Sequence, residues 1–309
     1  MTKLDQYKLN GKELVDITGA NYCDRPWYES TDDEHGTLMA NMILRINPWA
    51  KLYVMKLKSY QSNNRRTIYP ESAANAILGA IEEDVDIISM SWSIKAMASN
   101  QDNKEGTTEP IAIGRLRGAI DEAKKNKIIM FCSASDNIGT ASKANLPFTQ
   151  APNYIFRIGA ADHLGQPDAA SEDTSAINYY FPGNKVADSW NPRSLKTVEY
   201  HDGSSIATAL AAGLASLIMY CVLIVERYRT NYLKDEKKWP SIRKAIRIRD
   251  NLKRALDNID SSSWGGDKRY LPVWDIFGKA TTRINEAKSI EDMLYELEVF
   301  VTKLCHKVE

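Results

Sequence analysis

The sequence predicts an α/β fold in which a mostly parallel β-sheet carries helices on both faces and is followed by a helical carboxy-terminal extension. Two observations lead to this prediction. Short apolar runs alternate along the chain with segments of helical periodicity, and this alternation is typical of a parallel sheet covered by helices. The apolar runs are also nearly continuous, as expected for strands that are buried on both faces of such a sheet.

The first half of the chain supplies these elements in turn, after 34 polar and irregular residues. The spacing of apolar residues predicts a helix over 38–46, and alternation predicts a strand over 51–57. Residues 61–69 are polar and predict a loop. The other elements expected up to residue 160 are a helix over 71–83, a buried strand over 85–92, a helix over 111–126, a buried strand over 128–134 and a strand over 154–160.

An uncharged apolar stretch covers residues 206–225 and is long enough to cross a bilayer. It opens with Gly203, Ser204 and Ser205, however, and it is rich in alanine and glycine. We therefore expect a buried central helix rather than a membrane span.

Charged sequence with helical periodicity follows this stretch. Residues 228–239 are charged, 241–259 predict an amphipathic helix with six basic residues, and 281–304 predict a last amphipathic helix. The basic residues fit either a solvated helix face or a nucleic-acid surface, and the balancing acidic residues elsewhere favour the solvated face. We predict one domain over 1–278 and a helical tail over 279–309.

The composition narrows the class of protein and its partners. The 309 residues are 43% hydrophobic and 26% charged, which is ordinary for a globular protein, and 40 basic residues balance 40 acidic ones. A formal charge of zero gives no reason to expect a nucleic acid or an anionic membrane as partner. It also favours a place within a larger, multidomain protein.

The cysteines and the amino terminus bear on the cellular compartment. Cys23, Cys132, Cys221 and Cys305 lie far apart and lack the CxxC spacing of zinc sites. Cys132 and Cys221 lie in apolar runs and predict buried free thiols. Residues 1–12 are polar, with no apolar signal region. These features predict a reducing, cytoplasmic location, with no metal and no cofactor.

Polar patterns after predicted strands are where chemistry is expected, because loops at the carboxyl ends of parallel strands form the active sites of such sheets. His35 is followed by Gly36 and Thr37 just before a helix. This pattern is either a turn at the start of the helix or a general base, with Gly36 admitting a close approach of backbone.

Two further patterns have the same double interpretation. Asn137 lies in the polar turn after the strand over 128–134 and is either a turn residue or an amide donor to an oxyanion. Ser204 and Ser205 open the long apolar helix. Either one of them is the N-cap, or one is a nucleophile held where helix N–H groups stabilise negative charge.

The order of these patterns resembles the subtilase family of serine proteases. That family has a His-Gly-Thr motif opening a helix, an Asn-x-Gly turn after a buried strand, and a Gly-Thr-Ser-x-Ala-Thr-Pro motif at the start of the central helix. The similarity covers about residues 17–216 and continues weakly to the helix at Ser241. The corresponding segments here are His35-Gly36-Thr37, Asn137-Ile138-Gly139 and Gly203-Ser204-Ser205-Ile206-Ala207-Thr208, with a substrate strand at 89–93 and a turn at Pro182-Gly183.

The resemblance implies a subtilisin-like three-layer sandwich and a serine-type endopeptidase acting on peptides or proteins. It makes Ser205 the nucleophile and His35 the general base. Asn137 and the backbone N–H of Ser205 would form the oxyanion hole. The residues implied to line the cleft and pair with an extended peptide are Ser91, Trp92 and Ser93.

The chain departs from the family pattern at three positions. Ser204 replaces the family's threonine and Ala209 its proline, and neither change is expected to disable the site. The third departure concerns the aspartate that orients the histidine. In the family it follows an apolar strand in an Asp-Ser/Thr-Gly string, but Asp16 here has an extra residue before Thr18 and lies only nineteen positions before His35.

A better alignment matches residues 17–22 with the segment that follows the aspartate loop in the family. The aspartate would then lie upstream of Met1, because Asp32 and Asp33 are too close to His35 to end a strand. Loss of the strand that carries it would leave neighbouring strands unpaired.

Three classes of function follow from these residues. The first is a serine endopeptidase, and the second is a catalytically impaired pseudoprotease or interaction module that keeps the fold. The third is an esterase, because residues 203–207 approximate a nucleophile elbow. The esterase is disfavoured because residues 184–202 are polar and only His306 lies downstream.

Overall fold

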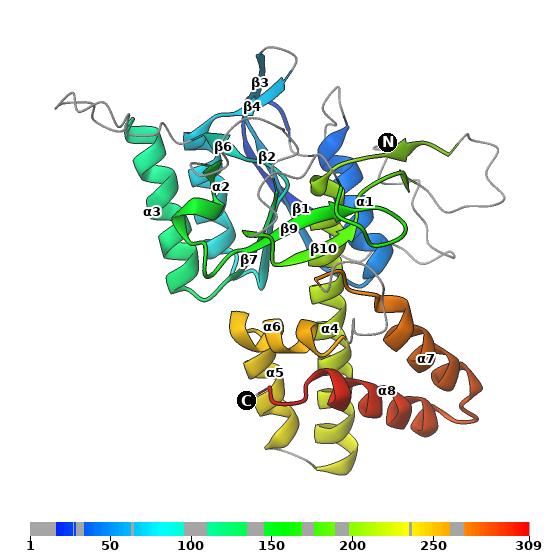
Figure 1. The fold of residues 1–309 in the computed structure, drawn as a ribbon. Helices are drawn as coiled ribbons and strands as arrows, with labels where there is room; N and C mark the ends of the chain where they lie inside the picture. The colour runs from blue at the N-terminus through cyan, green and yellow to red at the C-terminus, as the bar shows by residue number, and fades with distance from the viewer. Residues whose placement is uncertain are drawn as a thin grey trace.

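A computed structural model of the protein describes residues 17–26, 28, 34–62, 65–95, 110–134, 145–168, 176–188, 198–234, 237–259 and 269–308. At its centre lies a four-stranded parallel sheet in the order β10-β9-β7-β5 (Figure 1). A separate sheet pairs β1 with β2 in parallel. The strands are β1 (Ile17–Tyr22), β2 (Leu52–Leu57), β5 (Ile87–Met90), β7 (Ile129–Ser133), β9 (Phe156–Ala161) and β10 (Tyr179–Pro182).

Helices cover both faces of the central sheet. Side chains along β7 alternate between two clusters, because successive residues of a strand point to opposite faces. Ile129 and Phe131 pack with α1 (His35–Ile46) and α4 (Ser204–Leu233). Met130 and Cys132 pack with α2 (Pro70–Glu82) and α3 (Ile111–Lys125). The predicted α/β sandwich with helices on both faces is confirmed.

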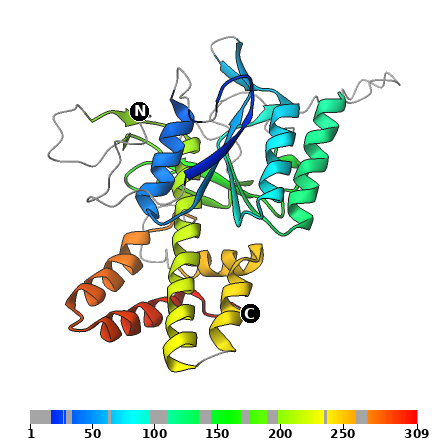
Figure 2. The same cartoon turned by 180° about the vertical axis from the view of Figure 1, so that it is seen from behind.

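Helix α4 passes through the centre of the molecule. It has 30 residues and extends beyond the expected end at Val225 to Leu233. By length and apolar composition it would suffice to cross a membrane, but 61% of its most apolar window is buried within the protein. Its first half packs on the sheet and α1, and its second half enters a lobe of helices (Figure 2). The prediction of a buried central helix is confirmed.

Among the residues that the structure describes, the carboxy-terminal lobe contains four helices where the sequence predicted two. The single helix expected over 241–259 is wrong, because Ile248 is extended and caps a second helix. The single helix over 281–304 is also wrong. Ser289 begins a new helix by accepting a hydrogen bond from the Asp292 N–H at 3.0 Å, a standard N-cap. The observed helices are α5 (Lys238–Ile246), α6 (Arg249–Asp257), α7 (Val273–Glu286) and α8 (Ile290–Leu304).

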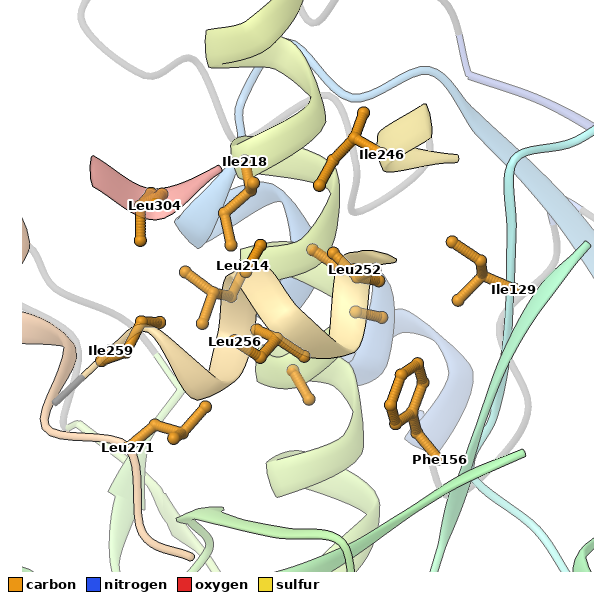
Figure 3. Close-up of a cluster of buried hydrophobic side chains, with 14 of the residues drawn as sticks. Ile129, Phe156, Leu214, Ile218, Ile246, Leu252, Leu256, Ile259, Leu271 and Leu304 are labelled. Carbon is orange, nitrogen blue, oxygen red and sulfur yellow. The ribbon is translucent and has the colours of Figure 1, made fainter. Parts of the chain in front are cut away.

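The lobe and the sheet share one hydrophobic cluster. Leu214 and Ile218 of α4 lie between Phe156 of the sheet and Leu304 of α8 (Figure 3). The boundary predicted at residue 278 lies inside α7. The division into a domain and a tail stays a prediction of the sequence.

Short strands surround the central sheet. The loop predicted over 61–69 is wrong, since β3 (Ser59–Ser62) and β4 (Arg65–Ile68) pair as an antiparallel hairpin. Its polar sequence carries no hydrophobic alternation that would have revealed it. The other short elements are β6 (Ile94–Lys95), β8 (Asn145–Leu146), η4 (Phe148–Gln150), β11 (Val186–Ala187) and β12 (Tyr200–His201).

A partly buried ion pair joins α4 to α8. The Arg229 guanidinium donates to both carboxylate oxygens of Glu298 at 2.6 and 2.5 Å, and Glu298 is 9% exposed. We expect Glu298→Ala to lower the free energy of unfolding by about 3 kcal/mol, because the arginine loses its counter-charge in a largely buried position. Urea unfolding measures this change.

The matched control on the same helix is Glu296→Ala. Glu296 lies 3.9 Å from Arg283, whose side chain is 62% exposed, so its removal should change stability by less than about 0.5 kcal/mol. Equal losses in the two variants would contradict the account of the Arg229 pair.

Candidate active site

Helices α1 and α4 pack side by side and run in the same direction. A Cβ placed on Gly213 of α4 would lie 3.1 Å from the carbonyl oxygen of Ile43 in α1. Further along both chains, Asn47 Nδ2 donates to Ser216 Oγ at 3.1 Å. Because both sets of contacts advance together in residue number, the packing is parallel.

This register brings His35 level with Ser205. His35 lies eight residues before Ile43, and Ser205 lies eight residues before Gly213. Since each helical residue rises about 1.5 Å, both side chains start about 12 Å from the contact at Gly213, at the same end of their helices. The predicted base and the predicted nucleophile therefore lie at the same level of two helices that pack against each other.

Ser205 is half-buried and faces the carboxyl end of β5. Its hydroxyl donates to the Ser91 carbonyl oxygen at 3.4 Å, and the Ser91 hydroxyl donates to the Ser205 carbonyl oxygen at 3.1 Å. The first bond is long, so the Ser205 hydroxyl is only weakly held.

Ser204 has a different role from its neighbour. It is fully buried, and its hydroxyl donates to the Ala134 carbonyl oxygen at 2.6 Å. Ala134 follows β7, so this bond fixes the first turn of α4 to the end of the central sheet. The N-cap interpretation of Ser204 or Ser205 is wrong, because Gly203 is the N-cap and no side chain caps the helix.

Two glycines make the turn into α4. Gly203 has φ 129° and ψ 156°, a conformation that L side chains rarely adopt. Its N–H donates to the Gly183 carbonyl oxygen at 2.8 Å. A Cβ on Gly183 would lie only 2.9 Å from the Gly203 carbonyl oxygen and 2.6 Å from Ala160 Cβ. Because Gly183 has no side chain, the segment that leads to Ser205 can pass close to the Pro182-Gly183 turn.

Helix α1 begins at His35, three residues before the start that the sequence predicted. Glu34 precedes it with φ 49°, and His35 is half-buried. The predicted close approach at Gly36 is not met by the described residues, since none of their atoms lies within 4 Å of a Cβ built there. Gly36 is exposed.

The predicted substrate residues form an irregular segment between β5 and β6. Ser91 contacts Ser205 through the two hydrogen bonds above. Ser93 is exposed, whereas Trp92 packs against the cluster that contains α2 and α3. Ser91 thus lies beside the candidate nucleophile, Ser93 faces solvent and Trp92 is turned to the apolar interior.

Several predicted positions lie outside the described residues: Asn137, Asp16, Asp32 and Asp33. Ile17, which follows Asp16, is the first residue of β1. Ile17 therefore lies at the amino end of β1, whereas α1 follows the carboxyl end of the same strand.

Cys132 does not compete as a nucleophile. It lies one residue before the end of β7 and is fully buried. Burial raises the pKa of its thiol to about 12, although the charge of Arg157 acts in the opposite direction. The thiolate needed for attack is therefore scarce at neutral pH.

Sequence reasoning missed a group of three side chains on the hairpin of β11 and β12. Ligand atoms of Asp188, Glu199 and His201 all lie within 4.8 Å of one another. They could hold a metal ion, although the group is at the surface. The signal was spread over two short strands, because Asp188 and Glu199 become neighbours only when the hairpin forms.

The same hairpin disfavours a nucleophile elbow of the esterase type. The strand before Ser205 is β12, which has two residues and pairs antiparallel with β11. An elbow instead follows a strand of the central sheet.

Comparisons with known proteins agree with this fold. Residues 7–226 match the model of the Subtilase family. The subtilisin-like protease het-Q2 of Podospora anserina is 28% identical over 189 residues, which are 60% of this chain and 48% of that protein. The chain thus spans about half the length of that curated relative.

Solved structures with the same fold include two proteases. A mutant of the protease domain of PatA has a TM-score of 0.55 and 18% identity, over 86% of this chain and 87% of that one. The prenylagaramide maturation protease PagA has a TM-score of 0.52 and 15% identity, over 92% and 94% of the two chains. At these identities the comparison shows a shared fold.

The two adjacent serines should differ in their effect on stability. We expect Ser204→Ala to lower the free energy of unfolding by about 2 kcal/mol, because it leaves the buried Ala134 carbonyl without this donor. Ser205→Ala should change it by less than about 0.5 kcal/mol, since its bond is long and half-exposed. Thermal or urea unfolding of both variants measures these changes. A larger loss of stability in Ser205→Ala than in Ser204→Ala would contradict the roles assigned to the two serines.

Proposed function

Because the chain belongs to the subtilase family, a family of serine peptidases, we propose that it is an endopeptidase in which Ser205 is the nucleophile and His35 the general base. The observation that carries the proposal is the register of α1 and α4, which makes the two side chains level. Its substrates would be peptides or proteins. A cytoplasmic location and a place within a larger multidomain protein stay predictions of the sequence.

The reaction would proceed by acyl transfer. Ser205 Oγ attacks the carbonyl carbon of the scissile peptide bond while its proton passes to His35. The tetrahedral intermediate collapses as His35 gives that proton to the leaving amine. Water then attacks the acyl-enzyme, with His35 again taking a proton, and Ser205 is restored.

The start of α4 supports the charge that forms on the substrate oxygen. Ser205 is the second residue of the helix, where backbone N–H groups and the helix dipole stabilise an anion. The Ser205 hydroxyl would exchange its long bond to the Ser91 carbonyl for the proton transfer to His35. Asn137 is proposed as the second donor, from the turn after β7.

The aspartate sets the expected rate. The sequence has no Asp-Ser/Thr-Gly string, and loss of the aspartate alone lowers turnover in serine proteases of this mechanism by about 10⁴-fold. We therefore propose that these 309 residues by themselves react slowly with substrates. This departure is also what favours the alternative function, a subtilase fold that binds peptides without cleaving them.

A fluorophosphonate probe tests the nucleophile. We expect slow covalent labelling of the folded chain that is abolished in Ser205→Ala and slowed at least about 100-fold in His35→Ala, since the base is then missing. Ser204→Ala is the matched control, because the Ser204 hydroxyl bonds to the Ala134 carbonyl oxygen and has no proposed part in the reaction. In-gel fluorescence over time measures the rate.

Two outcomes would reject the endopeptidase. One is labelling that persists in Ser205→Ala. The other is the absence of labelling in folded protein that has also been given an aspartate-bearing strand.

A further inference from the structure

The hairpin of β11 and β12 carries three potential metal ligands on one of its faces. The two strands pair antiparallel, with Val186 opposite His201. The Asp188 N–H donates to the Glu199 carbonyl oxygen at 2.9 Å, which continues the same register beyond the ends of the strands. Alternate residues of a strand share a face, and so do residues directly opposite each other. Glu199 and His201 therefore point to one side of the hairpin, and Asp188 joins them from the other strand.

The separations within this group suit a shared metal ion. One ligand atom from each of Asp188, Glu199 and His201 lies within 4.8 Å of the other two. Three atoms with such separations all lie within about 2.8 Å of a common point, and Zn²⁺ binds imidazole nitrogen and carboxylate oxygen at about 2.0–2.2 Å. Side-chain shifts of about 1 Å or less would therefore bring all three atoms to one ion.

The two carboxylates of the group lie close together without a basic partner. Across the described ranges of the chain, no lysine or arginine forms an ion pair or hydrogen bond with the side chain of Asp188, Glu199 or His201. Arg45 reaches the hairpin, but it donates to the Ala187 carbonyl oxygen at 2.8 Å. Two negative charges at this separation repel each other, and a cation between them would remove the repulsion.

The Asp188 carboxylate is held in place by the hairpin itself. Its Oδ1 accepts from the Glu199 N–H at 3.2 Å. This bond orients the carboxylate and leaves Oδ2 for a metal. Orientation of a ligating carboxylate by a hydrogen bond is a common feature of metal sites, because it reduces the freedom lost when the ion binds.

The backbone that presents these side chains is fixed at the base of the hairpin. The Lys185 N–H donates to Asp202 Oδ1 at 2.6 Å. The Gly203 N–H donates to the Gly183 carbonyl oxygen at 2.8 Å. Both strands are thus tied together beside the group, so its three side chains start from a defined backbone.

We propose that Asp188, Glu199 and His201 bind one divalent metal ion of the zinc class. The imidazole favours Zn²⁺ over Ca²⁺ and Mg²⁺, because these two ions prefer oxygen ligands. Three protein ligands leave the fourth tetrahedral position to water, and Glu199 is exposed while the other two are half-buried. The expectation of no metal rested on cysteine spacing, which does not test sites made of carboxylates and imidazole.

A bound ion would strengthen the segment that leads into α4. It would join one ligand of β11 to two of β12, in a pair of strands with only two residues each. Hairpins of this size are marginally stable by themselves. His201 lies four residues before Ser205, so the ion would also restrain the entry to the candidate nucleophile.

Titration of the full chain with zinc chloride tests the site. The background is Cys23→Ser, because the half-buried Cys23 thiol is the most accessible of the four. We expect calorimetry to show one zinc ion bound per chain. Zinc at about 100 times its dissociation constant should raise the melting temperature by at least about 2 °C, since a ligand of the folded state stabilises it.

Variants of the ligands identify the residues that bind. His201→Ala and Asp188→Asn should each weaken zinc binding at least about 100-fold, because loss of a group that only supports a ligand already costs about 10- to 100-fold. His163→Ala is the matched control and should bind as the unmodified chain does, since His163 is exposed and belongs to no such group among the described residues. Circular dichroism verifies that the variants fold.

The outcomes decide without any need for protease activity. Zinc binding that is lost in His201→Ala and kept in His163→Ala supports the site. Absence of zinc binding to the folded chain overturns it. Binding that persists in both His201→Ala and Asp188→Asn shows an adventitious ion only and also overturns it. Tighter binding of Ca²⁺ than of Zn²⁺ would reject the class of metal proposed here.

Discussion

The close parallel packing of α1 on α4 is the contact on which the rest of the structure depends. Gly213 makes it, because any side chain there would meet Ile46 Cβ at 3.0 Å and the Ile43 carbonyl oxygen at 3.1 Å. Stacking of Trp49 on Tyr220, with centroids 5.5 Å apart, continues the same register. The proposed chemistry depends on this register, since it places His35 and Ser205 at the same level although they are far apart in the sequence.

Much of the fold could be predicted from the chain alone, and the reason is burial. Strands such as β7 and the helix α4 are almost wholly buried, so their apolar runs are long and easy to recognise. Elements at the surface carried weaker signals. The break at Ile248 between α5 and α6 and the β3–β4 hairpin depend on backbone conformation and pairing, which composition does not reveal.

The site was predictable in its residues and not in its geometry. His35 and Ser205 were proposed from the order of the motifs and their resemblance to the subtilase family, and their catalytic roles stay predictions. The different roles of Ser204 and Ser205 were not predicted. They depend on the buried hydrogen bond from Ser204 to Ala134, which is 70 residues away in the chain.

The central claim is that the register of α1 and α4 places His35 close to Ser205, and a nitroxide spin label tests it without any need for activity. The label is attached to a cysteine in Ser205→Cys, in a background with Cys23→Ser, because the other three cysteines are buried. Nuclear magnetic resonance then records the histidine ring signals. The account predicts strong paramagnetic broadening at His35 and none at His306, which lies at the end of the helical lobe. An unbroadened His35 signal in the folded protein would contradict it.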